Sequence, residues 1–162
     1  MIKLLKQFRG KKAGLELVVF FFLGLASQGY GEENNAAEKA TVCFMQSCFY
    51  PEVARVQSQK QRGLMEREKL PEQGGMIFIY ENETRPLFWM KNMRIPLDFI
   101  WLDRWGKVVD IRENVPECRI ANCPTLESAK PAQYVLEISA GATQKNRIRM
   151  GDEAKIQLRN FT

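Results

Sequence analysis

The stretch from Leu87 to Leu102 constrains the fold more than any other part of this 162-residue chain. It holds two of the three tryptophans, and eleven of its sixteen residues are large and apolar. Apolar residues occupy both odd and even positions in two runs around a central proline, which predicts strands covered on both faces. The polar exceptions are Lys91, Asn92 and Asp98, which cluster where the chain turns between the two runs. A reactive or binding group is therefore to be sought at this turn first.

The other apolar runs are shorter and are separated by turn residues, which predicts seven or eight strands and two small helices. Strands are expected at 41–44, 49–56, 76–80, 107–112, 134–138 and 154–158, and helices from a capping box at 58–61 through residue 65 and from about 140 to 147. Strands and helices do not alternate in the rhythm of a parallel α/β sheet. The expected fold class is therefore mainly β (β-rich α+β): a single compact antiparallel β-sandwich or barrel with two short helices.

Residues 1–31 have the parts of an export signal, because a basic start is followed by a ten-residue apolar run at 17–26 and then by small residues. The run is shorter than the ~20 residues that span a bilayer as a helix. We expect a cleaved signal peptide, with an uncleaved N-terminal membrane tether as the alternative, and a periplasmic or extracellular location. Residues 32–40 are predicted to be a flexible tether and residues 41–160 a single β-rich domain.

The positive charge of the chain belongs mostly to this leader. Five basic residues and one acidic residue give residues 1–31 a charge of +4, out of +5 for the whole chain, which leaves about +1 for the rest. A protein that binds nucleic acid normally presents a clustered basic face. We therefore expect no nucleic-acid partner, and look instead to a small molecule, a glycan or a protein of the cell envelope.

The four cysteines also agree with export. They form two Cys-x-x-x-x-Cys pairs, Cys43 with Cys48 and Cys118 with Cys123. An even number of cysteines in an oxidising compartment predicts two disulfides, and two local bridges are the simplest of the three pairings. The rival interpretation is one zinc site that uses all four thiolates, which export and the lack of histidine disfavour. We therefore predict no metal.

The absence of histidine excludes several kinds of active site. Neither a Ser-His-Asp nor a Cys-His nucleophile system can form, nor can a His-Glu-x-x-His metal site. An enzyme without histidine relies on carboxylate, lysine or tyrosine acid–base chemistry. The candidates for such chemistry are Asp98, Lys91, Asn92, Glu113 and Glu137. No cofactor is predicted.

Asp98 shares its strand face with Ile100 and Leu102, so its carboxyl group is expected to be partly desolvated. In the favoured interpretation it accepts backbone N–H bonds at the strand turn or pairs with Lys91, because buried carboxylates need such partners. In the other interpretation, Asp98 and Lys91 form the polar floor of a binding pocket. The predicted binding residues are then Trp89, Met90, Lys91, Asn92, Asp98, Arg62 and Met65.

The remaining conspicuous side chains have structural explanations. Glu137 is expected to face solvent on a strand that is covered on one side, rather than to act as an acid–base partner. Trp89, Trp101 and Phe88 are expected to fill the core. Trp105 is the exception, because it lies at the tip of a predicted hairpin, where an exposed tryptophan is available for contact with a ligand, a membrane or a partner.

Several segments in order resemble the domain of unknown function 192 family, also called uncharacterised protein family 0127. The matching segments are Arg62-Gly63-Leu64-Met65, Gly75-Met76-Ile77-Phe78, Phe88-Trp89-Met90-Lys91-Asn92-Met93, Ile95-Pro96-Leu97-Asp98, Val135-Leu136-Glu137, Gly141 and Gly151-Asp152. They span roughly residues 41–158. The resemblance implies a compact β-rich fold that is often exported or membrane-tethered, and it implies no established reaction, cofactor or partner.

Three functions remain open at this point. The first is a non-catalytic exported domain that binds a small molecule, a glycan or an envelope protein through the predicted binding residues. The second is a histidine-independent hydrolase or lyase that uses Asp98 with Lys91 or Glu137. The third is a structural envelope protein whose contacts use Trp105 and the long loop at 113–131.

Overall fold

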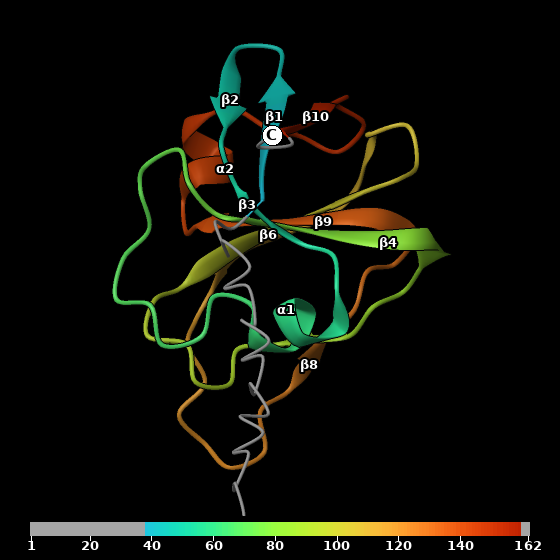
Figure 1. The fold of residues 1–162 in the computed structure, drawn as a ribbon. Coiled ribbons are helices and arrows are strands. Elements are labelled where there is room, and N and C mark those ends of the chain that lie inside the picture. Colours follow the sequence, from blue (N-terminus) through green and yellow to red (C-terminus); the bar gives the residue numbers. More distant parts are fainter. Residues whose placement is uncertain (1–37, 160–162) are drawn as a thin grey trace, which may run out of the picture. The chain divides into compact units, whose positions relative to one another are not determined.

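Strand β6, the second half of the central stretch, lies inside a large sheet in the computed structural model, which describes residues 38–159 (Figure 1). The helices and strands are β1 (Lys39–Phe44), β2 (Ser47–Phe49), β3 (Glu52–Ala54), α1 (Gln57–Arg62), β4 (Met76–Thr84), β5 (Phe88–Trp89), β6 (Leu97–Leu102), β7 (Val108–Val115), β8 (Thr125–Leu126), β9 (Ala132–Ser139), α2 (Ala142–Lys145) and β10 (Lys155–Arg159). The expected mostly β fold with two short helices is confirmed.

Eight strands form one mixed sheet. Its order is β10-β1-β3-β4-β9-β6-β7, with β2 paired to β1, and every pair is antiparallel except the parallel pair β3–β4. In Figure 1, β1 runs across the direction of β4, β9 and β6, so the sheet is curled. Strands β5 and β8 form a separate two-stranded sheet.

The curled sheet separates two hydrophobic cores. The α2-side core contains Ile100 and Leu102 of β6 together with residues of β1, β2 and the segment after α2, and the α1-side core contains Phe99 and Trp101 of β6 together with Leu64 after α1. Figure 1 shows α1 and α2 on opposite sides of the strands β4, β9 and β6. All six residues of β6 are buried, so this half of the central stretch is covered on both faces, as its sequence predicts.

The first half of the central stretch differs from the prediction. Only Phe88 and Trp89 form a strand there, and it pairs with β8 rather than joining the main sheet. Phe88 is buried in the α1-side core, but Leu87 and Trp89 are 65% and 49% exposed. The physical reason is that a two-stranded sheet lying on the core has only one covered face.

The predicted strand at 49–56 is split into β2 and β3 around Tyr50 and Pro51. The carbonyl oxygen of Pro51 accepts a hydrogen bond from the N–H of Ala40 at 2.9 Å. Pro51 has no N–H of its own to donate, so a continuous ladder cannot run through this position.

Helix α1 begins earlier and ends earlier than predicted. Its N-cap is Val56 rather than Ser58, and the side-chain oxygen of Gln59 accepts hydrogen bonds from the backbone N–H groups of Arg55 and Val56 at 2.9 and 3.1 Å. The helix stops at Gly63, which has a φ of +48° and therefore a conformation that favours glycine. Met65 lies in the following turn, outside the helix.

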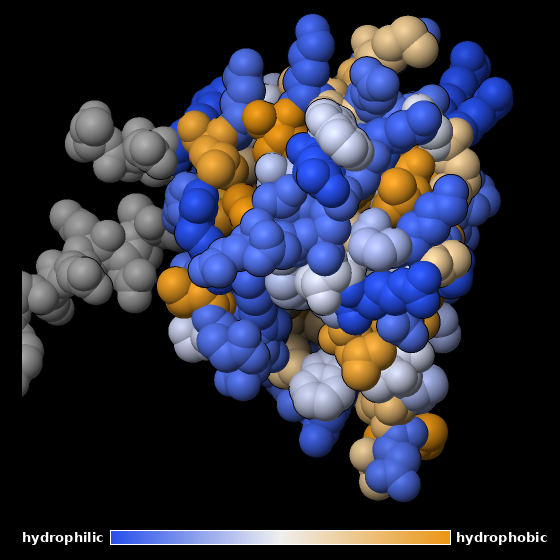
Figure 2. Space-filling view, turned by 90° about the vertical axis from the view of Figure 1, so that its right-hand side faces the viewer, coloured by the Kyte–Doolittle hydropathy of each residue, from blue (hydrophilic) through white to orange (hydrophobic). Residues whose placement is uncertain are grey.

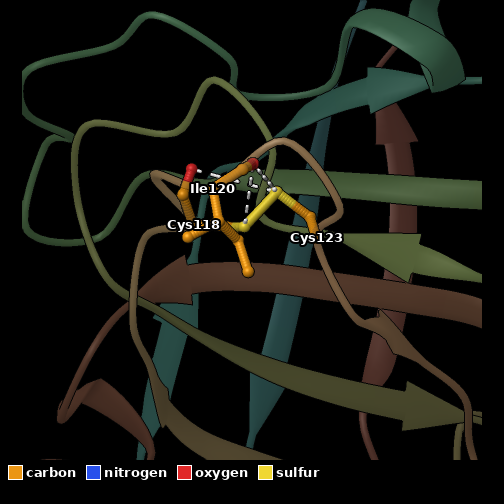
Figure 3. The surroundings of a disulfide bond; sticks show 3 residues. All are labelled: Cys118, Ile120 and Cys123. Atoms are coloured by element: carbon orange, nitrogen blue, oxygen red, sulfur yellow. Dashed lines mark hydrogen bonds between the residues drawn. A yellow bond between two sulfur atoms is a disulfide. The ribbon is translucent and has the colours of Figure 1, made fainter.

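Both cysteine pairs form local disulfides. Cys43–Cys48 joins directly paired positions of β1 and β2, and Cys118–Cys123 closes a small loop between β7 and β8 (Figure 3). The carbonyl oxygen of Ile120 lies 3.5 Å from Sγ of Cys123, inside this loop. All four sulfurs are bonded in pairs, as the disulfide interpretation predicts, rather than gathered as four thiolates.

The predictions for residues 1–31, and those for the tether as far as residue 37, lie outside the described residues. Strand β1 begins at Lys39, so the last two residues of the predicted tether belong to the sheet. Within residues 38–159, neither helix has the length and hydropathy that crossing a membrane requires.

Gly106 and Gly141 provide a matched test of one close approach in this fold. Their φ values are nearly equal, +84° and +82°. A Cβ at Gly106 would lie 2.3 Å from the carbonyl oxygen of Ala154, whereas a Cβ at Gly141 would have no neighbouring atom within 4 Å. We expect Gly141→Ala to cost about 1–2 kcal/mol through its backbone conformation alone. Gly106→Ala should cost at least about 2 kcal/mol more, because the β6–β7 turn must move away from the segment before β10.

Chemical denaturation of the two variants with disulfides intact measures this difference. Equal losses of unfolding free energy in both would contradict the close packing of the turn against Ala154.

Candidate functional site

Asp98 is a buried carboxylate that accepts three backbone hydrogen bonds. Its Oδ1 accepts from the N–H groups of Asn114 at 2.8 Å and Gly141 at 3.1 Å, and its Oδ2 accepts from the N–H of Thr143 at 2.9 Å. The side chain thereby joins β6 to the end of β7 and to α2. This arrangement agrees with the favoured interpretation, in which Asp98 holds the local geometry.

The other predicted site residues at the turn are separated from Asp98. Lys91 and Asn92 are exposed, and Asn92 has a φ of +58° with its carbonyl oxygen accepting the N–H of Glu66 at 2.9 Å. Asp98 points into the α2-side core, because its strand face is that of Ile100, whereas the segment around Met90 packs on the α1-side core. The structure therefore does not bring Asp98 and Lys91 together as the floor of one pocket.

Glu137 is buried, contrary to the expectation that it faces solvent. It lies on β9 opposite Met76 of β4 and Phe99 of β6, so its side chain belongs to the α1-side core. Burial raises the pKa of its carboxyl group to about 8. The expectation failed because β9 is a central strand covered on both faces, as the apolar residues on either side of Glu137 indicate.

Asp98 and Glu137 do not form a catalytic pair. Asp98 is paired with Ile138 and Glu137 with Phe99, so the two carboxyl groups point to opposite faces of the sheet. Glu113 is exposed on β7 and accepts a hydrogen bond from the side-chain amide of Gln144 at 3.2 Å. Asp98 on the α2 side, Glu137 in the α1-side core and Glu113 on the exposed surface of β7 are thus separated from one another.

A groove beside α1 brings other predicted residues together. This α1 groove, of about 380 Å³, is lined by Lys60 and Arg62 of α1, by Leu64 and Met65 of the next turn, by Phe78 and Tyr80 of β4, and by Leu87, Phe88 and Trp89. Arg62, Met65 and Trp89 belong to the predicted binding set. Its lining residues Leu64, Phe78 and Phe88 belong to the α1-side core, so the groove lies on that side of the sheet. Asp98 faces the other side.

Aromatic packing builds the floor of the groove. The rings of Phe78 and Phe88 meet edge to face with centroids 5.0 Å apart, and Phe88 contacts Phe99 in the same way at 5.6 Å. Gly63 leaves space above Phe78, whose Cζ would lie 3.5 Å from a Cβ at that position. The floor is therefore apolar and firmly packed, while Trp89 stands half-exposed at the rim.

Lys60 and Tyr80 are among the lining residues of the groove that the predicted binding set did not include. The ammonium group of Lys60 lies 4.2 Å from the centre of the Tyr80 ring, a cation–π contact. Burial lowers the pKa of Lys60, and burial together with the nearby charge of Glu137 raises the pKa of Tyr80 to about 12. The alternation of Met76 to Tyr80 was a usable signal for Tyr80, since it places that residue on the same face as Phe78.

Met90, the remaining member of the predicted binding set, lines a different hollow. This hollow, of about 400 Å³, lies under the Cys118–Cys123 loop, and the N–H of Cys118 donates to the carbonyl oxygen of Met90 at 3.2 Å. Its lining also includes Val115 and Leu126. It is a second, mainly apolar depression rather than part of the α1 groove.

Trp105 is exposed at the tip of the β6–β7 hairpin, as predicted. It is 73% exposed, the guanidinium of Arg104 lies 4.7 Å from its ring centre, and the neighbouring Met45 is 95% exposed at the tip of the β1–β2 hairpin. On the face that Figure 2 shows, apolar side chains form small separate groups among hydrophilic ones. Among residues 38–159, no group of three or more acidic or cysteine side chains is arranged to hold a metal ion.

Comparisons with known proteins give a family but no reaction. The model of the family DUF192, described as uncharacterized ACR, matches residues 41–156. A crystal structure of a protein of unknown function from Novosphingobium aromaticivorans DSM 12444 is similar, with 31% identity over 72% of this chain and 83% of that one and a TM-score of 0.64. A Sinorhizobium meliloti 1021 protein described as a "putative transcription regulator" is also similar, with 29% identity over 74% and 93% of the two chains and a TM-score of 0.65. No curated protein matches the sequence.

Replacement of Asp98 tests its structural role. Asp98→Ala leaves three backbone N–H groups without their acceptor in a buried place, which we expect to cost on the order of 3–5 kcal/mol of unfolding free energy. Urea denaturation measures the loss, and Asp103→Ala serves as a control, since that carboxylate caps an exposed turn. A loss below about 1 kcal/mol for Asp98→Ala would contradict this role.

The buried carboxyl of Glu137 predicts a dependence of stability on pH. The folded protein holds the proton up to about pH 8, whereas an unfolded chain releases it near the ordinary value of 4.5. The stability that depends on this protonated group is complete below about pH 4.5 and is lost as the pH rises towards 8, by on the order of 1.4 kcal/mol per pH unit. Glu137→Gln should remove this loss.

The measurement is the unfolding free energy of both proteins between pH 5 and 8, with Glu127→Gln at an exposed position as the control. Parallel pH profiles for the wild type and Glu137→Gln would show that Glu137 is ionised in the folded protein.

Proposed function

The chain belongs to the DUF192 family, and from that premise we propose that it is a non-catalytic, exported ligand-binding domain of the cell envelope, with the α1 groove as its binding site. The family description supplies no activity, so the proposal rests on the site. The observation that carries it is the half-exposed Trp89 at the rim of a groove whose floor is apolar. Concave sites of this kind, with an apolar lining and a few polar groups, are where small ligands bind.

The exposure of Trp89 is informative because a large aromatic side chain gains free energy when it is covered. Trp89 and Leu87 both present apolar surface to solvent next to the groove. A ligand that lies against them would bury this surface, at roughly 25 cal/mol for each Å² removed from water. Phe88 in the floor of the groove is already packed against Phe78 and Phe99, so little conformational entropy is lost when the groove is filled.

The two disulfides suggest an oxidising, exported location. Ligands in such a place include glycans, peptides and amphiphilic fragments of the envelope. The description of the Sinorhizobium relative as a transcription regulator is not extended to this chain, because the residues beyond 31 carry a net charge of only about +1.

A binding role is favoured over a hydrolase or lyase because the acid–base candidates do not meet in the groove. The carboxylate of Asp98 is engaged by three backbone N–H groups on the other side of the sheet. Lys91 is exposed, and neither it nor Glu137 is among the residues that line the groove. General acid–base catalysis needs such groups within hydrogen-bond reach of the substrate.

A second candidate is attachment to an envelope protein through the hairpin tips. Trp105 and Met45 are the most exposed large apolar side chains of the described residues, and both border one hollow of about 900 Å³. Such neighbouring exposed apolar residues are typical of contact sites. This role would be independent of the α1 groove.

A thermal-shift screen of the full chain against glycans, peptides and amphiphilic envelope fragments tests the first proposal. A compound that binds the folded state raises the Tm by mass action, and Trp89→Ala should abolish that rise. Trp105→Ala is the matched control, because it removes an exposed tryptophan elsewhere on the molecule. A rise that survives Trp89→Ala but disappears in Trp105→Ala would overturn the groove as the site and favour the hairpin tips.

A further inference from the structure

The charged residues that line the α1 groove are both cations. They are Lys60, in the middle of α1, and Arg62, at its end, and no carboxylate is among the lining residues. The other lining residues are apolar, aromatic or neutral polar, apart from Tyr80, whose hydroxyl stays protonated because its pKa is about 12. The groove therefore presents positive charge to whatever enters it.

Neither cation has an ion-pair partner among residues 38–159. Arg67, by contrast, is paired with Glu52 through two hydrogen bonds of 2.6 and 2.7 Å. The charge of Glu81 acts on Lys60 from a distance without forming an ion pair. Within residues 38–159, the positive charge of the groove is thus left without a close counter-charge.

Lys60 is also partly withdrawn from water. It is half-buried against the face of Tyr80, and this desolvation is the largest cause of the lowering of its pKa. A desolvated ammonium group without a counter-ion is stabilised when an anion binds beside it. Arg62, which is exposed, offers a planar fork of N–H donors that suits a carboxylate or a phosphate.

The apolar half of the site complements this charge. Trp89 offers a half-exposed aromatic surface, and Leu87 extends it. Flat or apolar groups pack well on an exposed indole. One ligand that carries both an anionic group and a flat apolar body would satisfy both halves at once.

We infer that the ligand of the α1 groove is an organic anion, with its carboxylate, phosphate or sulfonate at Lys60 and Arg62 and its flat apolar body against Trp89. The inference rests on the proposed function, because it specifies the ligand class of the same groove. The cations lie on α1 and Trp89 lies on β5, so the charge interaction and the aromatic packing can be removed by separate substitutions.

A pair of fluorescent probes separates them. 8-Anilinonaphthalene-1-sulfonate carries an anionic group on an aromatic body, and N-phenyl-1-naphthylamine has the same aromatic body without the charge. Titration of the full chain with each probe, at low and at high salt, gives the two Kd values. We expect the sulfonate to bind more tightly than the neutral probe and to lose that advantage as salt screens the cations.

Variants assign each part of the binding. Lys60→Gln combined with Arg62→Gln should raise the Kd of the sulfonate about tenfold while changing that of the neutral probe less than about twofold. Trp89→Ala should weaken both probes. Lys91→Gln and Trp105→Ala, at an exposed cation and an exposed tryptophan outside the groove, should change neither, and unchanged Tm values show that the variants fold.

The outcomes distinguish the inference from the proposal beneath it. If Trp89→Ala weakens both probes but the charge variants bind the sulfonate as the wild type does, the groove stands and the anionic ligand is overturned. If Trp89→Ala weakens neither probe, or the wild type binds neither, the groove itself is not the binding site.

Discussion

The burial of β6 and β9 on both faces is the constraint on which the rest of this structure depends. Because successive side chains of a strand point to opposite faces, each of these strands contributes to two separate cores. Phe99 and Trp101 pack on one side of the sheet, and Ile100 and Leu102 pack on the other. A change of register by one residue would exchange these sets and place a carboxylate among aromatic rings, so the register is strongly specified.

Because the two faces of the sheet carry separate cores, they also hold different polar groups. On the α2 side, the carboxylate of Asp98 accepts three backbone hydrogen bonds and so connects β6 to β7 and α2. On the α1 side, burial favours the uncharged form of Glu137. The groove on this side is lined by the two cations, Lys60 and Arg62. The groove exists because the chain leaves the main sheet at β5, which keeps Phe88 in the core but turns Trp89 outward. The positive charge comes from a helix too short to bury any of its own residues.

The sequence predicts the class of fold, the disulfide pairs, the exposed Trp105 and the doubly covered β6, because apolar periodicity and cysteine spacing are local signals. It even places Asp98 correctly on the face of Ile100. It could not show which side of the sheet holds Trp89, since periodicity within a strand carries no information about the partner strand. For that reason Asp98 and Trp89 were assigned to one pocket. Lys60 and Tyr80 were missed because their meeting depends on how α1 docks on β4, a tertiary contact without a local signal. Glu137 was misjudged because a single acidic residue in an apolar run fits both an exposed and a buried strand.

Native-state hydrogen exchange of the backbone amides tests the central claim most directly. If β6 and β9 are covered on both faces while β5 lies outside the main sheet, the amides of β6 and β9 exchange only through global unfolding, and their opening free energies equal the full stability of the protein. The amides of β5 and β8 should exchange through local opening at a much lower free energy. If β6 exchanged as readily as β5, the central strands would not be the doubly covered core, and the separation of the two faces, with the groove that follows from it, would be wrong.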